Sequence, residues 1–322
     1  MASKTKASLN GASSNSASSN GASPNGASTK FFPVLYNAPS TPDMAVVMAF
    51  FNPARSLRII QNILMVKSLF ERSNIPFFIG EIAFADEPFS FSIAENIFQY
   101  RSESYMFYKE NLINLMVAKL PTQYTKVLMM DADIVFAEPN WYDVVSQKLN
   151  AYAVIQPYQK ANYLNQQFEV IQIKQSVATN PSNGHTGFVW AFQRDWLSAN
   201  PLFDYAVIGG GDSILKARVL QTPLMSVHKT YEKDYNAYNA KRAEPLGWCP
   251  LTIYHLPHGM KENRQYDTRN AELGNKFAVL KITSVSDAVK RRDDGLLTWK
   301  DAPRAELNKL MKSYFMKRND DA

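Results

Sequence analysis

An unbroken apolar run, Met44–Phe51, most constrains how this chain can fold. A run of strand length without alternating polar residues indicates a strand that is buried on both faces. Asn52-Pro53 ends the run, and in residues 55–72 the apolar side chains then fall at helical spacing. Residues 75–84 have the composition of a second strand. This order predicts a βαβ unit, and so an α/β, Rossmann-like fold with a mostly parallel central sheet flanked by helices.

The rest of the chain continues this alternation. Apolar spacing predicts one helix over residues 105–120, closed by Pro121, and another that begins near Asp212. Residues 302–316 are expected to form a C-terminal helix that packs back on the domain. Four further strands are predicted, at Lys126–Met130, 151–156, 187–192 and 252–256.

The first residues of the chain differ from the rest. Residues 1–30 are almost all Ser, Ala, Asn and Gly, and Asn-Gly-Ala-Ser recurs from Asn10, Asn20 and Asn25. Such a segment buries no apolar surface, so residues 1–35 are predicted to form a disordered tail. No linker interrupts residues 36–300, which we interpret as a single domain followed by the C-terminal helix within residues 301–322.

Composition excludes several classes of protein. The formal net charge is +6, but the basic residues are scattered, which argues against a nucleic-acid partner. Cys249 is the only cysteine, so neither an intrachain disulfide nor a cysteine-based zinc site is possible. No apolar run reaches the roughly 18–20 residues of a transmembrane segment, and the start of the sequence lacks the pattern of a secretory signal. We therefore expect a cytoplasmic protein.

The strongest sign of chemistry is Asp131-Ala132-Asp133, directly after the strand predicted at Lys126–Met130. In an open α/β sheet, ligands bind at the carboxyl ends of strands. Two carboxylates separated by one residue can share Mg²⁺ or Mn²⁺, one directly and one through water or a bound phosphate, and the ion stabilises a leaving diphosphate. The alternative is that the motif only ends a strand and caps a turn.

A phosphatase is a second enzymatic interpretation of the same motif. Phosphatases of the haloacid dehalogenase type also place Asp-x-Asp after an apolar strand and use the first aspartate as nucleophile. In those enzymes the motif lies on the first strand of the core, whereas here a complete βαβ pattern precedes Asp131. The position in the chain therefore disfavours the phosphatase.

Two histidines, His255 and His258, lie at the end of a late predicted strand, just before Gly259. Neutral imidazole is a good ligand for Mn²⁺ beside carboxylates, which adds both histidines to the two aspartates as candidate metal ligands. The neighbouring Lys261 and Arg264 would meet phosphate oxygens. A purely structural role stays open for each histidine.

Three further features offer polar groups to a ligand. Gly209-Gly210-Gly211 would let the backbone approach a ligand closely, and Asp212 would either cap the following helix or act as general base toward an attacking hydroxyl. Lys109 would steady a diphosphate or organise the aspartates, or else be a solvated charge. The stretch Asn183-Gly184-His185-Thr186-Gly187-Phe188-Val189-Trp190 has the composition of a sugar-facing wall, or of an ordinary turn.

Taken together, these motifs resemble the GT-A glycosyltransferases, especially a group found in phages and large DNA viruses. The resemblance covers most of residues 44–270, and the order and spacing of its pieces are more specific than any one of them. The pieces are Phe51-Asn52-Pro53, Lys109-Glu110, Asp131-Ala132-Asp133 with Trp141, Gly187-Phe188-Val189-Trp190, Gly210-Gly211-Asp212, and His255-Leu256-Pro257-His258-Gly259 with Arg264.

The resemblance implies a donor site for a nucleotide sugar. The donor would be a UDP-sugar such as UDP-glucose or UDP-galactose, held with Mn²⁺ or Mg²⁺. The site would use residues that meet the base or ribose, residues of the metal motif, and basic residues that meet the phosphates: Phe50, Phe51, Asn52, Lys109, Asp131, Ala132, Asp133, Lys261 and Arg264. A histidine would complete the metal site, with His258 slightly preferred over His255.

The activity that follows is transfer of a hexose to a glycan or glycoprotein acceptor. Asp212 resembles the acceptor-side carboxylate of the family, although Gly-Gly-Asp stands here where many relatives carry Glu-Asp. Asp212 would be the base if the reaction inverts the anomeric centre, and would position the acceptor if it retains the configuration. The alternative from another class is a protein that binds nucleotide sugars or carbohydrates without turnover, against which the full set of acidic and histidine groups argues.

Overall fold

The central sheet of the computed structural model has seven strands, in the order β10-β6-β9-β4-β1-β2-β3. The structure describes residues 31–238 and 244–322, so most of the predicted tail lies outside the described residues. All neighbouring pairs in this sheet are parallel except the two that involve β9. The strands are β1 (Met44–Phe51), β2 (Phe77–Phe84), β3 (Ile97–Ser102), β4 (Lys126–Met130), β6 (Val154–Gln156), β9 (Val189–Gln193) and β10 (Leu246–Trp248).

Strand β1 lies inside this sheet and shows why its sequence is apolar throughout. Successive side chains of a strand point to opposite faces of the sheet. Met44, Val46 and Met48 enter the core on one face, whereas Ala45 and Val47 enter the core on the other. Because both faces are covered by protein, no position on β1 favours a polar residue.

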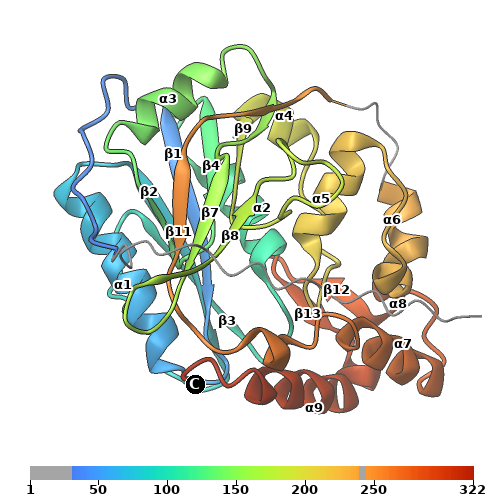
Figure 1. Cartoon of the computed structure of the whole chain (residues 1–322). Coiled ribbons are helices and arrows are strands. Elements are labelled where there is room, and N and C mark those ends of the chain that lie inside the picture. The colour runs from blue at the N-terminus through green and yellow to red at the C-terminus, as the bar shows by residue number, and fades with distance from the viewer. Residues whose placement is uncertain (1–30, 239–243) are drawn as a thin grey trace, which may run out of the picture.

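Helices cover both faces of the sheet. Helices α1 (Leu57–Arg72) and α3 (Trp141–Lys148) pack on the face that includes Met48. Helices α2 (Lys109–Lys119), α4 (Arg194–Ala199) and α5 (Gly211–Leu220) pack on the opposite face. Figure 1 shows α1 on the left of the sheet and α2, α4 and α5 on its right. The predicted α/β class, with a mostly parallel sheet flanked by helices, is confirmed.

A second sheet, of four strands, brings together segments that lie far apart in the sequence. Its order is β5-β11-β7-β8, and its strands are β5 (Ile134–Phe136), β7 (Lys160–Leu164), β8 (Val170–Gln175) and β11 (Thr252–His255). Strand β5 begins directly after Asp133 and pairs antiparallel with β11, so that His255 lies opposite Ile134. This register, and a bond from the Leu256 N–H to the Asp133 carbonyl (2.8 Å), bring Asp133 beside the late histidines.

In the C-terminal part of the chain, helices α6, α7 and α8 and the β12-β13 hairpin lie to the right of the central sheet in Figure 1, and α9 lies below it. Helix α9 buries Leu307, Met311 and Phe315 in a core shared with α7 and with the hairpin β12-β13. The elements of this part are η1 (Ser226–Tyr231), α6 (Glu232–Tyr238), η2 (Lys261–Arg264), α7 (Arg269–Val279), α8 (Val285–Ala288), β12 (Val289–Arg291), β13 (Leu297–Trp299) and α9 (Asp301–Lys317). The helix predicted at residues 302–316 matches α9.

Two boundaries differ from the sequence analysis. The helix predicted from residue 105 begins at Lys109, because the Phe107 N–H bonds to the Val207 carbonyl (2.8 Å) and not within a helix. Phe31, which falls in the predicted tail, is buried, and its N–H donates to the Phe168 carbonyl (2.8 Å). Within the described residues, no helix combines the length and apolarity needed to cross a bilayer.

The packing of α1 predicts a sharp contrast between neighbouring residues. Ile63 is 0% exposed and Leu64 is 47% exposed. Ile63→Ala should lower the free energy of unfolding by about 2–5 kcal/mol, because it leaves a cavity between α1 and the sheet. Leu64→Ala should change it by only about 0.5 kcal/mol, because this side chain already meets solvent. Urea denaturation of both variants measures the difference, and equal losses would contradict this packing.

Candidate functional site

Two groups of charged side chains meet at the carboxyl end of β4. Strands β1 and β4 are parallel neighbours, so both end at the same edge of the sheet. Asp131 and Asp133 follow β4 there, and the first turns of α2 and α5 bring Lys109 and Asp212 to the same edge. The candidate residues are thus collected by the fold from distant parts of the chain, as expected for a sheet that binds ligands at its strand ends.

Lys109 is the centre of the first group, which we call the lysine cluster: Lys109, Asp131 and Asp212. The Lys109 Nζ lies 2.6 Å from Asp131 Oδ1, and donates to Asp212 Oδ1 and Oδ2 at 3.0 and 3.1 Å. Burial lowers the pKa of Lys109, but the carboxylates of Asp131, Asp212 and Glu110 outweigh burial and raise it. Lys109 therefore stays charged, and since it is only 8% exposed, the alternative of a solvated charge is wrong.

The second group, the histidine cluster, consists of Asp133, His255 and His258. The Asp133 Oδ2 lies 2.6 Å from Nε2 of His258 and 3.7 Å from Nε2 of His255, and the two Nε2 atoms are 3.1 Å apart. Burial would raise the pKa of Asp133, but His258 and His255 outweigh it and lower the pKa below its usual range. Asp133 therefore carries a negative charge toward the two imidazoles.

The histidine cluster has the dimensions of a metal site. Ligand atoms about 2.0–2.2 Å from one ion lie roughly 3 Å apart when the angle between them is near 90°, and the three spacings above bracket this value. The Asp133 Oδ1 is buried and has no hydrogen-bond partner among the described residues, so it is available to a cation. No other group of three such ligands occurs in the described part of the chain. The carboxylate suits both Mn²⁺ and Mg²⁺, and the two imidazoles favour Mn²⁺ over Mg²⁺, which takes oxygen ligands.

Asp131 and Asp133 are thus divided between the two clusters. The structure joins Asp133 to both histidines, whereas Asp131 turns to Lys109. Ala132 lies between them and is half-buried. A direct metal bond from Asp131, one of the four ligands predicted from the sequence, stays a prediction.

The three glycines before Asp212 make room for protein side chains. An added Cβ at Gly209 would lie 3.0 Å from the Arg269 guanidinium, and at Gly211 only 1.9 Å from Oε1 of Glu110. Gly210 has φ +101°, in the region that favours glycine, and lies against His228. The run therefore serves close packing at the start of α5, where the sequence suggested approach to a ligand.

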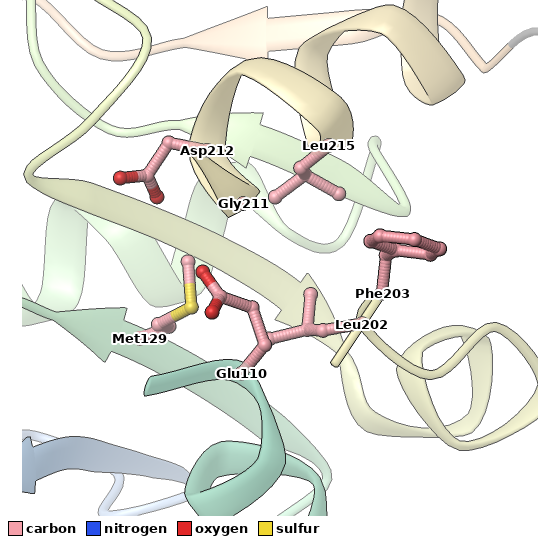
Figure 2. Close-up of a pocket in the computed structure, with 7 residues that line it drawn as sticks. All are labelled: Glu110, Met129, Leu202, Phe203, Gly211, Asp212 and Leu215. Carbon is pink, nitrogen blue, oxygen red and sulfur yellow. The ribbon is translucent and has the colours of Figure 1, made fainter. Parts of the chain in front are cut away.

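The buried side chain of Glu110 occupies the space that is left because Gly211 has no Cβ. Figure 2 shows its side chain extending from α2 toward Gly211 and Asp212, beside Met129, Leu202, Phe203 and Leu215. Burial raises the pKa of Glu110 to about 8, although Lys109 lowers it. Its proximity to Gly211 ties the starts of α2 and α5 together, and so holds Lys109 close to Asp212.

An aromatic wall joins the two clusters: the polar stretch ahead of β9 supplies His185 and Phe188, whereas no sequence motif pointed to Tyr163. The His185 ring stacks on Phe188 with centroids 3.9 Å apart, and the rings of Phe188 and Tyr163 each lie 5.1 Å from His255. Phe188 has φ +81°, which is strained for a residue with a side chain and is found most often at functional sites. A Cβ at Gly187 would lie 3.0 Å from the His185 ring and 3.1 Å from Oδ2 of Asp212, so this glycine keeps space between the wall and Asp212.

The remaining predicted residues lie around these clusters. Phe50 is 2% exposed, and its ring packs edge-on against Phe91. Phe51 packs against Phe107, Tyr108 and Phe315. The Asn52 side chain bonds to both backbone groups of Ser56, ahead of α1. Lys261 is exposed on η2, whereas Arg264 is turned inward, with Nη2 in contact with His258. Donor binding by these five residues stays a prediction.

Comparison with known proteins identifies no family. No protein-family model matches the sequence, and no curated protein matches it. A mutant β-1,4-galactosyltransferase 7 from Drosophila, in complex with manganese, UDP-Gal and xylobiose, is 11% identical, with a TM-score of 0.40 over 83% of this chain and 98% of that chain. Glucosyl-3-phosphoglycerate synthase from Mycobacterium tuberculosis, in complex with Mn²⁺, UDP and phosphoglyceric acid, is 10% identical, with a TM-score of 0.37 over 74% and 78%.

A third solved structure widens the range of similar proteins. The 4-diphosphocytidyl-2C-methyl-D-erythritol synthase from Anaerococcus prevotii is 11% identical, with a TM-score of 0.34 over 72% of this chain and 98% of that chain. Similarity at this level assigns no activity to the chain.

The ion pairs of Lys109 predict how the free energy of unfolding changes when the lysine charge is removed. Lys109→Met leaves Asp131 and Asp212 facing each other without a counter-charge. It should lower the free energy of unfolding by about 3 kcal/mol, the lower end of the range for a broken buried pair, because both carboxylates remain partly exposed. Adding Asp131→Asn should recover part of the loss. Chemical denaturation measures both effects.

Lys119, at the other end of α2 and exposed, supplies the matched control. Lys119→Met should change stability far less than Lys109→Met. Equal effects of the two substitutions, or no recovery in the double variant, would contradict the ion pairs described for Lys109.

Proposed function

We propose that the chain is a metal-dependent GT-A glycosyltransferase that moves a hexose from a UDP-sugar to a glycan or glycoprotein. The observation that carries the proposal is the convergence of Asp133, His255 and His258 beside the partnerless Asp133 Oδ1, at the end of β4. A carboxylate that follows a central strand and faces two imidazoles suits a cation that holds a diphosphate. The order of motifs along the chain supports the same family.

The two clusters have different roles in the proposed reaction. Mn²⁺, or Mg²⁺, would supply a positive charge that stabilises the leaving diphosphate. Asp133, His258 and His255 would hold the ion, and Asp131, paired with Lys109, would act on it indirectly. The Lys109 ammonium, 2.6 Å from Asp131, fixes this carboxylate and adds a fixed positive charge near the place where negative charge develops.

Asp212 faces the acceptor in this proposal. Its carboxylate is one-quarter exposed and lies across Gly187 from the aromatic wall, so it can reach a bound hydroxyl group. In an inverting reaction, Asp212 takes the proton of that hydroxyl. In a retaining reaction, it orients the acceptor. His185 and Phe188 offer a flat surface on which a sugar ring can stack.

The donor's other end would meet the carboxyl end of β1. Phe50 and Phe51 end this strand and Asn52 follows it, next to β4, which suits contacts of their backbone groups with the base and ribose. Lys261 and Arg264 follow the histidine cluster and would meet phosphate oxygens. A cytoplasmic location and kinship with viral enzymes stay predictions from the sequence.

Two other functions are less well supported. A nucleotide-sugar-binding protein without turnover would need no exposed carboxylate such as Asp212 on the acceptor side. A phosphatase of the haloacid dehalogenase type would carry its nucleophilic aspartate after the first strand of the core, whereas Asp131 follows β4, the fourth strand along the chain. Both features favour the transferase.

Donor hydrolysis tests the proposed function. The chain with Mn²⁺ and UDP-glucose or UDP-galactose should release UDP, and a chelator should stop the release. Asp133→Ala and His258→Ala should each stop it too. Each should weaken Mn²⁺ binding by at least the roughly 10–100-fold that loss of an outer-shell partner costs. Calorimetry measures the affinity and chromatography measures UDP.

The control for these variants is Asp195→Ala, which removes an exposed aspartate on α4 and should change neither quantity. Tight binding of a UDP-sugar without release of UDP from any donor would favour the binding protein. Unchanged Mn²⁺ affinity in Asp133→Ala would reject the metal site.

A separate prediction concerns Asp212. Asp212→Asn keeps the shape of the side chain but cannot take a proton. If Asp212 is the base, kcat for transfer should fall by about 10²–10⁴-fold, while Mn²⁺ and UDP affinities stay unchanged because Asp212 is outside the histidine cluster. If it orients the acceptor, KM for the acceptor should rise instead. Steady-state kinetics separates the two, and unchanged values of both would remove Asp212 from the mechanism.

A further inference from the structure

Residues 318–322 lie against the histidine cluster, although no motif in the sequence pointed to them. Asp320 is 4% exposed, and its carbonyl accepts the Gly259 N–H at 3.0 Å, one residue beyond His258. Its side chain faces the same imidazole: Oδ1 of Asp320 lies 3.5 Å from Nδ1 of His258. A buried carboxylate thus touches the side of His258 that faces away from Asp133.

The charge of Asp320 is balanced by two arginines. Oδ1 lies 3.2 Å from Nη2 of Arg264 and 3.2 Å from Nη2 of Arg318, and Oδ2 lies 3.1 Å from Nε of Arg318. A carboxylate is buried at an acceptable cost only when such partners replace water. The surroundings therefore keep Asp320 in the ionised form, which accepts hydrogen bonds and donates none.

An imidazole that binds a metal through Nε2 must carry its proton on Nδ1, and it needs an acceptor there. Arg264 also touches Nδ1 of His258, but a guanidinium only donates. Among the described residues, Asp320 is the acceptor within reach of Nδ1. We propose that Asp320 is a positioning residue, which accepts the Nδ1 proton of His258, draws Arg264 onto itself and so leaves the Nε2 lone pair free for the metal. This inference rests on the metal site proposed above.

The fold holds Asp320 in place from two sides. Gly259 has φ +50°, and a Cβ there would lie 3.0 Å from Cα of Asp320, so a glycine permits the close approach of the two segments. The next residue, Asp321, accepts from Ser56 Oγ at 2.6 Å and from the Arg58 N–H at 2.8 Å, at the start of α1. Figure 1 marks this end of the chain beside the lower end of α1.

Titration of the full chain with Mn²⁺ alone tests the inference. Asp320→Asn and Asp320→Ala should bind Mn²⁺ about 10–100-fold more weakly than the unsubstituted chain, as expected for loss of an outer-shell partner. Asp321→Asn removes the same charge one residue away, keeps an acceptor for α1, and should change the affinity by less than about twofold. Calorimetry gives the affinities, and circular dichroism with thermal melting checks that each variant is folded.

A spectroscopic measurement separates positioning from a general structural role. In chain labelled with ¹⁵N-histidine and loaded with diamagnetic Mg²⁺, His258 should show the Nδ1–H tautomer, and Asp320→Asn should shift it toward Nε2–H. Asp321→Asn should leave the His258 tautomer unchanged.

Three outcomes distinguish failure of the role proposed for Asp320 from failure of the metal site on which it rests. Mn²⁺ affinity within twofold of the unsubstituted chain in both Asp320 variants would overturn the role of Asp320 and leave the metal site standing. Equal losses in Asp320→Asn and Asp321→Asn would also overturn it, because they would indicate an effect of charge alone. An unsubstituted chain that binds no Mn²⁺ would overturn the metal site itself.

Discussion

The ammonium group of Lys109 lies between two carboxylates that come from different parts of the chain, and the arrangement of the site depends on it. Asp131 follows the central strand β4, and Asp212 begins α5. Without a cation between them, these two carboxylates would repel each other, and α5 could not start so close to the end of β4. The same ion pairs turn Asp131 away from the histidine cluster. One buried lysine therefore lies between the histidine cluster, the proposed metal site, and Asp212, the proposed acceptor-side carboxylate.

The parts of the fold that could be predicted are those whose signal is local. The elements β1, β4, α1 and α9 could be predicted because burial on both faces of a strand leaves an unbroken apolar run, and burial of one face of a helix leaves helical spacing. The second sheet could not be predicted in the same way. Strand β8 has only half-buried and exposed residues, and β5 has three residues, so neither carries a clear period.

The same distinction between local and long-range signals applies to the candidate site. Asp131, Asp133, Lys109 and the two histidines were visible because acidic, basic and imidazole groups stand out beside apolar strands. Their partition into two clusters was not visible, because it depends on which side chains Lys109 and His258 meet across the fold. The glycines before Asp212 were interpreted as room for a ligand, but protein side chains fill that space. A glycine in the sequence indicates a close approach without showing whether a ligand or another side chain approaches.

Strand β9 is the antiparallel member of the central sheet, and its direction determines which of its ends reaches the site. A parallel strand would bring its carboxyl end to Asp131, whereas β9 brings its amino end, with the Phe188 carbonyl accepting the Asp131 N–H at 2.8 Å. The connection from β8 into β9 therefore supplies His185 and Phe188 of the aromatic wall, while the histidine cluster comes from the chain after β4 and around β11. Because the wall and the histidine cluster are built on separate segments, substitutions in the β8–β9 connection can reshape the wall during evolution while Asp133, His255 and His258 stay in place.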